Sequence, residues 1–144
     1  MAQVERNDPY LNVRFLVEID GLLVAGFTEV SGLQMETESQ DYIEGGVNDY
    51  VHKLPKISKQ SNISLKRGIT DSDVLWRWHQ DVVNGNIQRK NGRIILYDFE
   101  GNEKWRWVFK EAFPVKWTGP EFRAGGNTVA VESLDLVHHG VTRS

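Results

Sequence analysis

The sequence is as informative in what it lacks as in what it contains. It has 144 residues and no cysteine, which excludes disulfides, thiolate zinc sites and cysteine nucleophiles. No apolar run approaches the 18 or so residues of a membrane-spanning helix, so we expect no stable membrane insertion. Lys and Arg total 17 against 20 Asp and Glu. The chain therefore lacks the basic excess that is typical of nucleic-acid-binding proteins.

The aromatic content and the alternation of apolar with polar residues indicate a β-rich domain. The segments that alternate in this way are 11–20, 22–39, 61–68, 87–99, 105–110, 113–118 and 128–138. Asp20-Gly21 is a strong hairpin signal, so 22–39 is expected to run back against 11–20. A turn is expected at 100–103 and a possible one at Asn91-Gly92. A slip in apolar parity predicts a bulge near Glu132-Ser133.

One segment has helical periodicity instead. Val74, Leu75, Trp78 and Val82 recur at helical spacing, and 70–73 supplies residues that favour an N-cap. The expected fold is mainly β: an antiparallel β-sandwich or barrel of six to seven strands, with one flanking α-helix and a long inter-strand loop. Residues 1–144 are expected to form a single domain, with 1–10 as a polar N-terminal arm.

Groupings that would carry chemistry are missing. The histidines at 52, 79, 138 and 139 do not have the spacing of a metal site. Asp71 and Asp73 precede the helical segment, where capping explains them better than paired catalysis does. No Gly-x-Ser-x-Gly elbow or phosphate-binding loop is present. We therefore expect no catalytic residue, no cofactor and no metal, and the aromatic run 105–109 is expected to be core.

The most unusual stretch is the connector between 22–39 and 61–68. Loops longer than about 12–15 residues without their own structure are uncommon and usually functional. This one is rich in apolar side chains that a solvated loop would not need, so it either folds back on its own domain or is buried against another molecule. These residues are Tyr42, Ile43, Val47, Tyr50, Val51, Leu54 and Ile57.

The strands that flank this loop each have one polar parity. An isolated barrel would have this pattern, and so would a subunit whose sheets join those of its neighbours into a ring with a polar inner wall. In the ring, the lumen-facing residues would be Gln34, Glu36, Glu38, Asn62, Ser64 and Lys66.

The chain resembles the tail-tube proteins of contractile-tailed bacteriophages and the inner-tube proteins of contractile injection systems. The resemblance runs from Asp8 to about Val141 and depends on the order and spacing of several short segments. These are DPYLNVRFLVEIDG, AGFTEVSGL, YIEGG, KLPKI, NISLKRGIT, the Trp76/Trp78 helix, LYDFEGN, AFPVKWTGPEF and VAVESLDLVHHG.

The resemblance implies a non-enzymatic structural subunit that forms hexameric rings stacked into a rigid tube. The tube conveys cargo, which is DNA in phages and toxin protein in injection systems, through the target envelope. YIEGG and KLPKI match the loop between subunits, which adds Glu44, Gly45, Gly46 and Pro55 to the contact residues. The inner wall would come from AGFTEVSGL onward, NISLKRG, the strand at 105–113 and the last strand.

The implied partners are further copies of the chain, a contractile sheath protein, and baseplate and terminator proteins. Because 1–10 has neither a basic nor an apolar signal region, we expect synthesis in the bacterial cytoplasm without a signal peptide, and function in an assembled particle. The alternatives are the tube of a true phage tail or of a type VI-like secretion machine, and a monomeric ligand-binding barrel.

Overall fold

A computed structural model describes residues 9–10, 14–42, 52–126 and 128–144 of the chain. Within these residues it contains nine strands and one helix. In chain order the elements are β1 (Arg14–Ile19), β2 (Phe27–Ser31), β3 (Met35–Tyr42), β4 (His52–Gln60), β5 (Ile63–Gly68), α1 (Val74–Val83), β6 (Lys90–Tyr97), β7 (Glu103–Thr118), β8 (Val131–Val137) and β9 (Val141–Arg143). The mainly β, antiparallel fold with one helix is confirmed.

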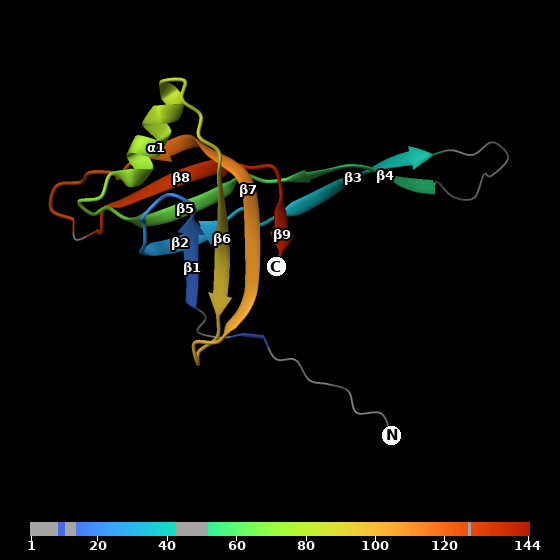
Figure 1. The fold of residues 1–144 in the computed structure, drawn as a ribbon, viewed down its shortest axis with the longest axis horizontal. Coiled ribbons are helices and arrows are strands. Elements are labelled where there is room, and N and C mark those ends of the chain that lie inside the picture. Colours follow the sequence, from blue (N-terminus) through green and yellow to red (C-terminus); the bar gives the residue numbers. More distant parts are fainter. Residues whose placement is uncertain (1–8, 11–13, 43–51, 127) are drawn as a thin grey trace.

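Seven strands form one antiparallel sheet that bends into two layers at β7. The order is β1-β6-β7-β8-β5-β2, with β9 also pairing with β7. The first half of β7 pairs with β6 and β9, and residues 113–118 pair with β8. We call β1, β6, β9 and the first half of β7 the first layer, and β2, β5, β8 and 113–118 the second layer. Strands of the two layers cross at a steep angle (Figure 1).

The bend in β7 has a local cause at Glu111. This residue has a φ of 55°, which is rare for a non-glycine residue, and β6 and β7 change register here. This change of register is a β-bulge, and Glu111 is not paired with a β6 residue there. Its backbone amide instead donates to Asn91 Oδ1 at 2.9 Å. The possible turn at Asn91-Gly92 was therefore wrong: both residues lie inside β6. Gly92 is needed there because a Cβ would lie 2.3 Å from the Phe109 ring.

Apolar side chains from both layers and from α1 meet in the core. Phe109 of β7 is fully buried there, and Leu75 and Trp78 of the helix are also core residues. The buried residues of the strands alternate with exposed ones, as expected. The remaining core residues are Val17, Ile19, Ile63, Leu65, Ile94, Ala112, Leu134 and Leu136. The aromatic run was expected in the core, and Phe109 and Trp107 confirm this, while Trp105 is 37% exposed.

A buried ion pair interrupts the apolar pattern of β5 and β8. Arg67 and Glu132 face each other across the two strands and are 3% and 4% exposed. Arg67 Nε donates to Glu132 Oε1 at 2.6 Å, and Trp117 Nε1 donates to Glu132 Oε2 at 3.1 Å. The bulge expected near Glu132-Ser133 is absent from β8, whose register is continuous. The prediction failed because a carboxylate occupies the inward position.

The first predicted hairpin was wrong in its partner. The turn at Asp20-Gly21 exists, with Gly21 at a φ of 79°. However, β1 pairs with β6, and after the turn the chain crosses to the second layer, where β2 pairs with β5. Gly32, at a φ of 89°, separates β2 from β3, so the expected single strand 22–39 becomes two. Only glycine fits here, because a Cβ would lie 1.9 Å from the Asn62 carbonyl oxygen.

The helix spans the expected residues, but its predicted cap does not form. Asp73 occupies the N-cap position without a side-chain hydrogen bond to the helix backbone. Its carboxylate instead accepts a hydrogen bond from Arg77 Nε at 2.8 Å, one turn along the exposed face. No helix in the described residues is long and apolar enough to cross a membrane.

Candidate assembly surfaces

The outer face of the second layer is a polar wall built from four strands. Residues that alternate with the buried core positions point outward, and the strand registers place them in two rows. One row crosses the layer as Ser31, Ser64, Asp135 and Lys116. The other row crosses as Glu29, Lys66, Ser133 and Thr118. We call these eight residues the polar wall.

The charges of the polar wall are mixed and cancel. It contains two acidic and two basic side chains, one pair in each row. Lys66 Nζ lies 3.4 Å from Glu29 Oε2, and this ion pair is largely solvated. Exposed ion pairs contribute little to stability. The mixture of acidic and basic side chains therefore mainly affects the electrostatic potential of the surface. The wall therefore presents hydrogen-bonding groups without a field of one sign.

The structure places the six residues predicted to line a lumen on two adjoining strand pairs. Ser64 and Lys66 lie in the polar wall, and Asn62 is exposed just before β5. Gln34 precedes β3, and Glu36 and Glu38 lie on β3, which among the described strands pairs with β4. The β3–β4 pair continues the β2–β5 pair in the same register, and that these six residues face a lumen stays a prediction.

The resemblance implied β2 and β8 as wall strands, but the wall residues of β2, β7 and β8 were not among those predicted individually. The aromatic half of β7 was expected to contribute to the wall, but Trp105 and Trp107 belong to the first layer. The contribution comes from 113–118, where a register shift between Pro114 and Lys116 obscures the alternation. Ser133 and Asp135 were missed because a bulge was assumed beside them.

The expected long loop is largely a β-hairpin. β3 and β4 pair from Met35↔Gln60 to Tyr42↔His52, with one register shift between Thr37 and Ser39. The hairpin extends from one end of the second layer, away from the rest of the domain (Figure 1). Lys59 Nζ binds Glu38 Oε1 at 2.9 Å, and the Thr37 and Ser58 hydroxyls are 2.7 Å apart.

The hairpin carries apolar side chains that its own domain does not cover. Ile57 is 72% exposed, Met35 is 65% exposed and Leu54 is 47% exposed. An isolated two-stranded hairpin is marginally stable in water, so burial of these side chains by a partner would stabilise it. Of the predicted contact residues, Leu54, Pro55 and Ile57 lie on β4 and Tyr42 ends β3. Residues 43–47, 50 and 51 lie outside the described residues.

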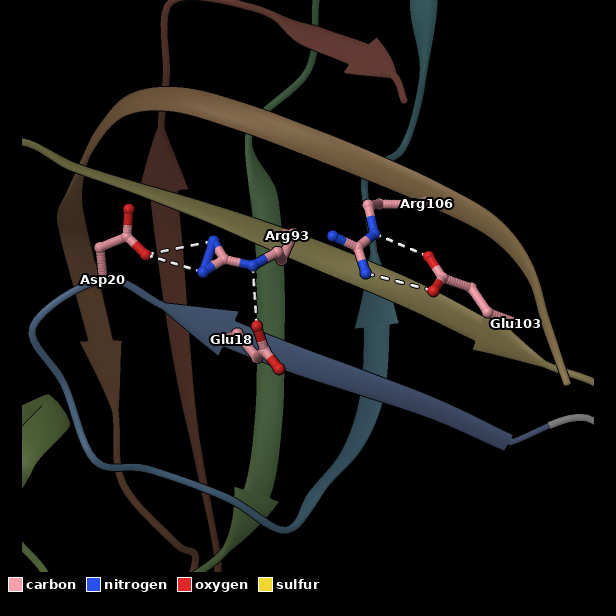
Figure 2. A network of polar contacts seen from close by, with 5 residues as sticks. All are labelled: Glu18, Asp20, Arg93, Glu103 and Arg106. Carbon is pink, nitrogen blue, oxygen red and sulfur yellow. Dashed lines mark hydrogen bonds and ion pairs between the residues drawn. The ribbon is translucent and has the colours of Figure 1, made fainter. Parts of the chain in front are cut away.

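The outer face of the first layer carries a separate network of ion pairs (Figure 2). Arg93 of β6 binds Glu18 at 2.7 Å and Asp20 at 2.9 Å. On β7, Arg106 Nε lies 2.7 Å from Glu103 Oε1, and this contact raises the pKa of Arg106 above its ordinary value. The strand registers also place Leu16, Ile95 and Val108 on this face, so the paired charges lie among apolar residues.

The described residues contain no group of three or more side chains that would hold a metal ion. His138 has both ring nitrogens engaged: Gly140 N donates to Nδ1 at 3.1 Å, so Nε2 carries the proton and donates to Ser61 O at 2.8 Å. His139 Nε2 lies 3.3 Å from Arg89 Nη1. These contacts anchor the end of β8, and they give His138 and His139 a structural role.

A polar wall and an apolar hairpin that the described residues leave exposed are features of a subunit that assembles. The family model of the T4-like virus tail tube protein gp19 matches residues 11–142 of the chain. The chain belongs to this tail tube family. It is therefore a structural tube protein of contractile systems and not an enzyme.

Two solved structures of contractile injection systems contain chains with the same fold as this tail tube protein. A chain in the cryo-EM structure of the anti-feeding prophage cap (AFP tube terminating cap) is 26% identical, with a TM-score of 0.86. The match covers 99% of this chain and 95% of that one. A chain in the sheath-tube complex of the extracellular contractile injection system PVC, in its extended state, is 28% identical. Its TM-score is 0.83, and the match covers 94% of this chain and 91% of that one.

More distant matches show the fold alone. Hcp1 from Flavobacterium johnsoniae is 16% identical, with a TM-score of 0.57, over 90% of this chain and 93% of that one. No curated protein matches the chain in sequence.

Proposed function

We propose that this tail tube protein forms the inner tube of a phage-tail-like contractile injection system, as hexameric rings stacked into a hollow tube with the polar wall facing the lumen. The observation that carries the proposal is the wall itself. Four adjacent strands present one continuous polar face, while their other face is buried in the core. A water-filled lumen needs polar residues along it, as in other hollow β-structures.

The free edges of the second layer support ring formation. Within the described residues, β2 pairs only with β5, and 113–118 pair only with β8. Exposed edges are liabilities that proteins cover or close, and a ring of copies closes both at once. Each copy then contributes four strands to a continuous inner wall.

The β3–β4 hairpin is proposed as the contact between neighbouring copies, within a ring and between rings. Its apolar side chains are exposed in the single subunit and become buried when copies meet. Burial of apolar surface stabilises a contact by about 25 cal/mol per Å². Because every pair of neighbouring copies would bury these side chains, the contacts together would make the tube rigid. The rigidity lets the tube transmit the force of sheath contraction.

The proposed partners follow from the solved structures that the chain resembles. Those structures include a sheath-tube complex, a sheath/tube terminator and a baseplate. We propose a contractile sheath, a terminator and a baseplate as partners, and a phage-tail-like particle as the place of function. The balanced wall suits a cargo of toxin protein or DNA, because neither would bind strongly to a lumen without a field of one sign.

Negative-stain electron microscopy of the purified protein tests the proposal. Concentrated protein should form rings or hollow tubes, whereas a monomeric ligand-binding barrel would remain a single species of 16.5 kDa. The double variant Leu54→Asp/Ile57→Asp should stay folded and soluble but form no tubes. Leu23→Asp is the matched control, because Leu23 is 96% exposed and lies outside the hairpin. Normal tubes from the hairpin variant would refute the proposed contact.

A further inference from the structure

We propose that an ion pair between Lys116 of one copy and Glu29 of the next closes the seam between neighbouring copies in the ring. This inference rests on the proposed function, since it requires the two free edges of the second layer to meet. It goes further by naming the two side chains that select the partner edge. The ligand at each edge is a second copy of the same chain.

Strand direction allows the two edges to pair. The four strands of the second layer are all antiparallel in the order 113–118, β8, β5, β2, so the two edge strands run in opposite directions. Copies related by rotation about an axis along the strands keep their strand directions. The β7 edge of one copy therefore meets the β2 edge of the next in an antiparallel arrangement, and the sheet continues without a break.

The two edges carry opposite charges on the wall face. Glu29 is the charged wall residue of β2, and its side chain is 61% exposed. Lys116 is the charged wall residue of 113–118 and is also exposed. None of the described acidic side chains forms an ion pair with Lys116, although Asp135 faces it across the strands. One edge thus carries a carboxylate, which pairs with Lys66 at 3.4 Å in the single subunit, and the other carries an ammonium group that no described carboxylate pairs with.

The distance across a strand pair suits this contact. Directly opposite residues have Cβ atoms about 4.5–5.5 Å apart, and diagonal neighbours about 7–8 Å, which long side chains still span. Glu29 shares a row with Thr118, and Ser31 shares one with Lys116. Lys116 therefore reaches Glu29 of the next copy either diagonally, when the rows continue unshifted, or directly, when they shift by two residues.

Lysine on an edge strand can also serve as a guard against pairing. The two roles predict opposite results when the charge is reversed. If Lys116 only prevented unwanted strand pairing, glutamate at position 116 would prevent it equally well, and assembly would not depend on Glu29. A seam residue requires an opposite charge on the neighbouring edge.

The experiment uses Lys116→Glu and Glu29→Lys, alone and mixed, with ring and tube formation followed by electron microscopy and sedimentation. Each variant alone places like charges at every seam and should need about tenfold more protein to assemble. In an equimolar mixture the copies can alternate, which restores opposite charges at every seam, so assembly should return toward the wild-type concentration. The double variant Glu29→Lys/Lys116→Glu should also recover, because it exchanges the charges within one chain.

Lys110→Glu and Glu100→Lys are matched controls with the same charge changes on exposed positions outside the wall. They should assemble as the wild type does, alone and mixed. Assembly of either seam variant at the wild-type concentration, or a mixture that assembles no better than its components, would overturn the seam pair and leave the tube function intact. Wild-type protein that never assembles would instead overturn the proposed function, and the seam with it.

Discussion

The buried pair of Arg67 and Glu132 yields the largest effect that we expect from a single side chain. In Glu132→Gln, the guanidinium of Arg67 would remain charged and 3% exposed without its carboxylate. Breaking a buried pair by removing one partner costs about 3–5 kcal/mol, because a buried charge is left uncompensated. For a domain of this size, that corresponds to a decrease of about 10 °C in Tm.

The double variant Arg67→Met/Glu132→Leu tests whether the loss of stability in Glu132→Gln comes from the unpaired charge of Arg67. It removes both charges, but it leaves Trp117 Nε1 without its acceptor, and it leaves Ser72 O (3.0 Å) and Ala25 O (3.4 Å) without their Arg67 donors. Each lost hydrogen bond costs about 1 kcal/mol and the bond to Ala25 is long, so the double variant should lose about 2–3 kcal/mol, which is less than the single variant loses.

Urea unfolding of the unassembled subunit, followed by circular dichroism, measures both variants. The concentration must stay below that of assembly, since binding to other copies raises the apparent stability. Arg77→Ala is the control, because its pair with Asp73 is exposed and worth about 0.3–0.5 kcal/mol. If Glu132→Gln lost less than 1 kcal/mol, or if the double variant were the less stable of the two, the reasoning would be refuted.

Three further predictions concern local structure. Gly32→Ala should lower the free energy of unfolding in urea by more than about 2 kcal/mol, because φ is 89° and the new Cβ would lie 1.9 Å from a carbonyl oxygen. Gly26→Ala is the control, since Gly26 has a φ of 81° but open space around it, and it should cost about 1 kcal/mol. Equal losses in the two variants would contradict this prediction. Arg93→Ala should cost about 1 kcal/mol by the same assay, since its two partners are half-exposed; a loss above 3 kcal/mol would show a deeper role. Hydrogen bonds from the Asn102 and Glu100 amides lower the pKa of Asp98 below its ordinary value. The turn is therefore stabilised while Asp98 is ionised, and it loses this contribution as pH falls through the lowered pKa. Thermal unfolding of Asp98→Asn between pH 2 and 6 should therefore show a smaller loss of Tm on acidification than the wild type, and parallel curves would contradict the effect.

Local patterns in the sequence were enough to predict the elements with a regular period. Alternation placed Ile63 and Leu65 in the core, and helical spacing gave the bounds of α1 and its buried Trp78. These predictions succeeded because one face of each element is apolar throughout. The mainly β fold followed from the same signal.

The failures occurred where a long-range partner changes the meaning of a residue. Glu132 is on the inward face only because Arg67, from a distant strand, neutralises it. The polar sequence of β4 gives little strand signal, since both faces of the hairpin are exposed. Of the polar wall, Ser64 and Lys66 were found from their own strand, but the rows depend on strand registers that no local pattern encodes.

Single-cysteine labelling of assembled tubes measures most directly whether the polar wall faces an enclosed lumen. The chain has no cysteine, so Ser133→Cys introduces one thiol in the wall, and Arg77→Cys places one on exposed α1, which packs on the opposite face of the second layer. In free subunits both thiols should react with a bulky maleimide-polymer. In tubes, Arg77→Cys should still react with the polymer, whereas Ser133→Cys should be protected from the polymer by the tube itself and still react with a small maleimide. Equal reactivity of Ser133→Cys toward the polymer in tubes and in free subunits would contradict a lumen lined by this face.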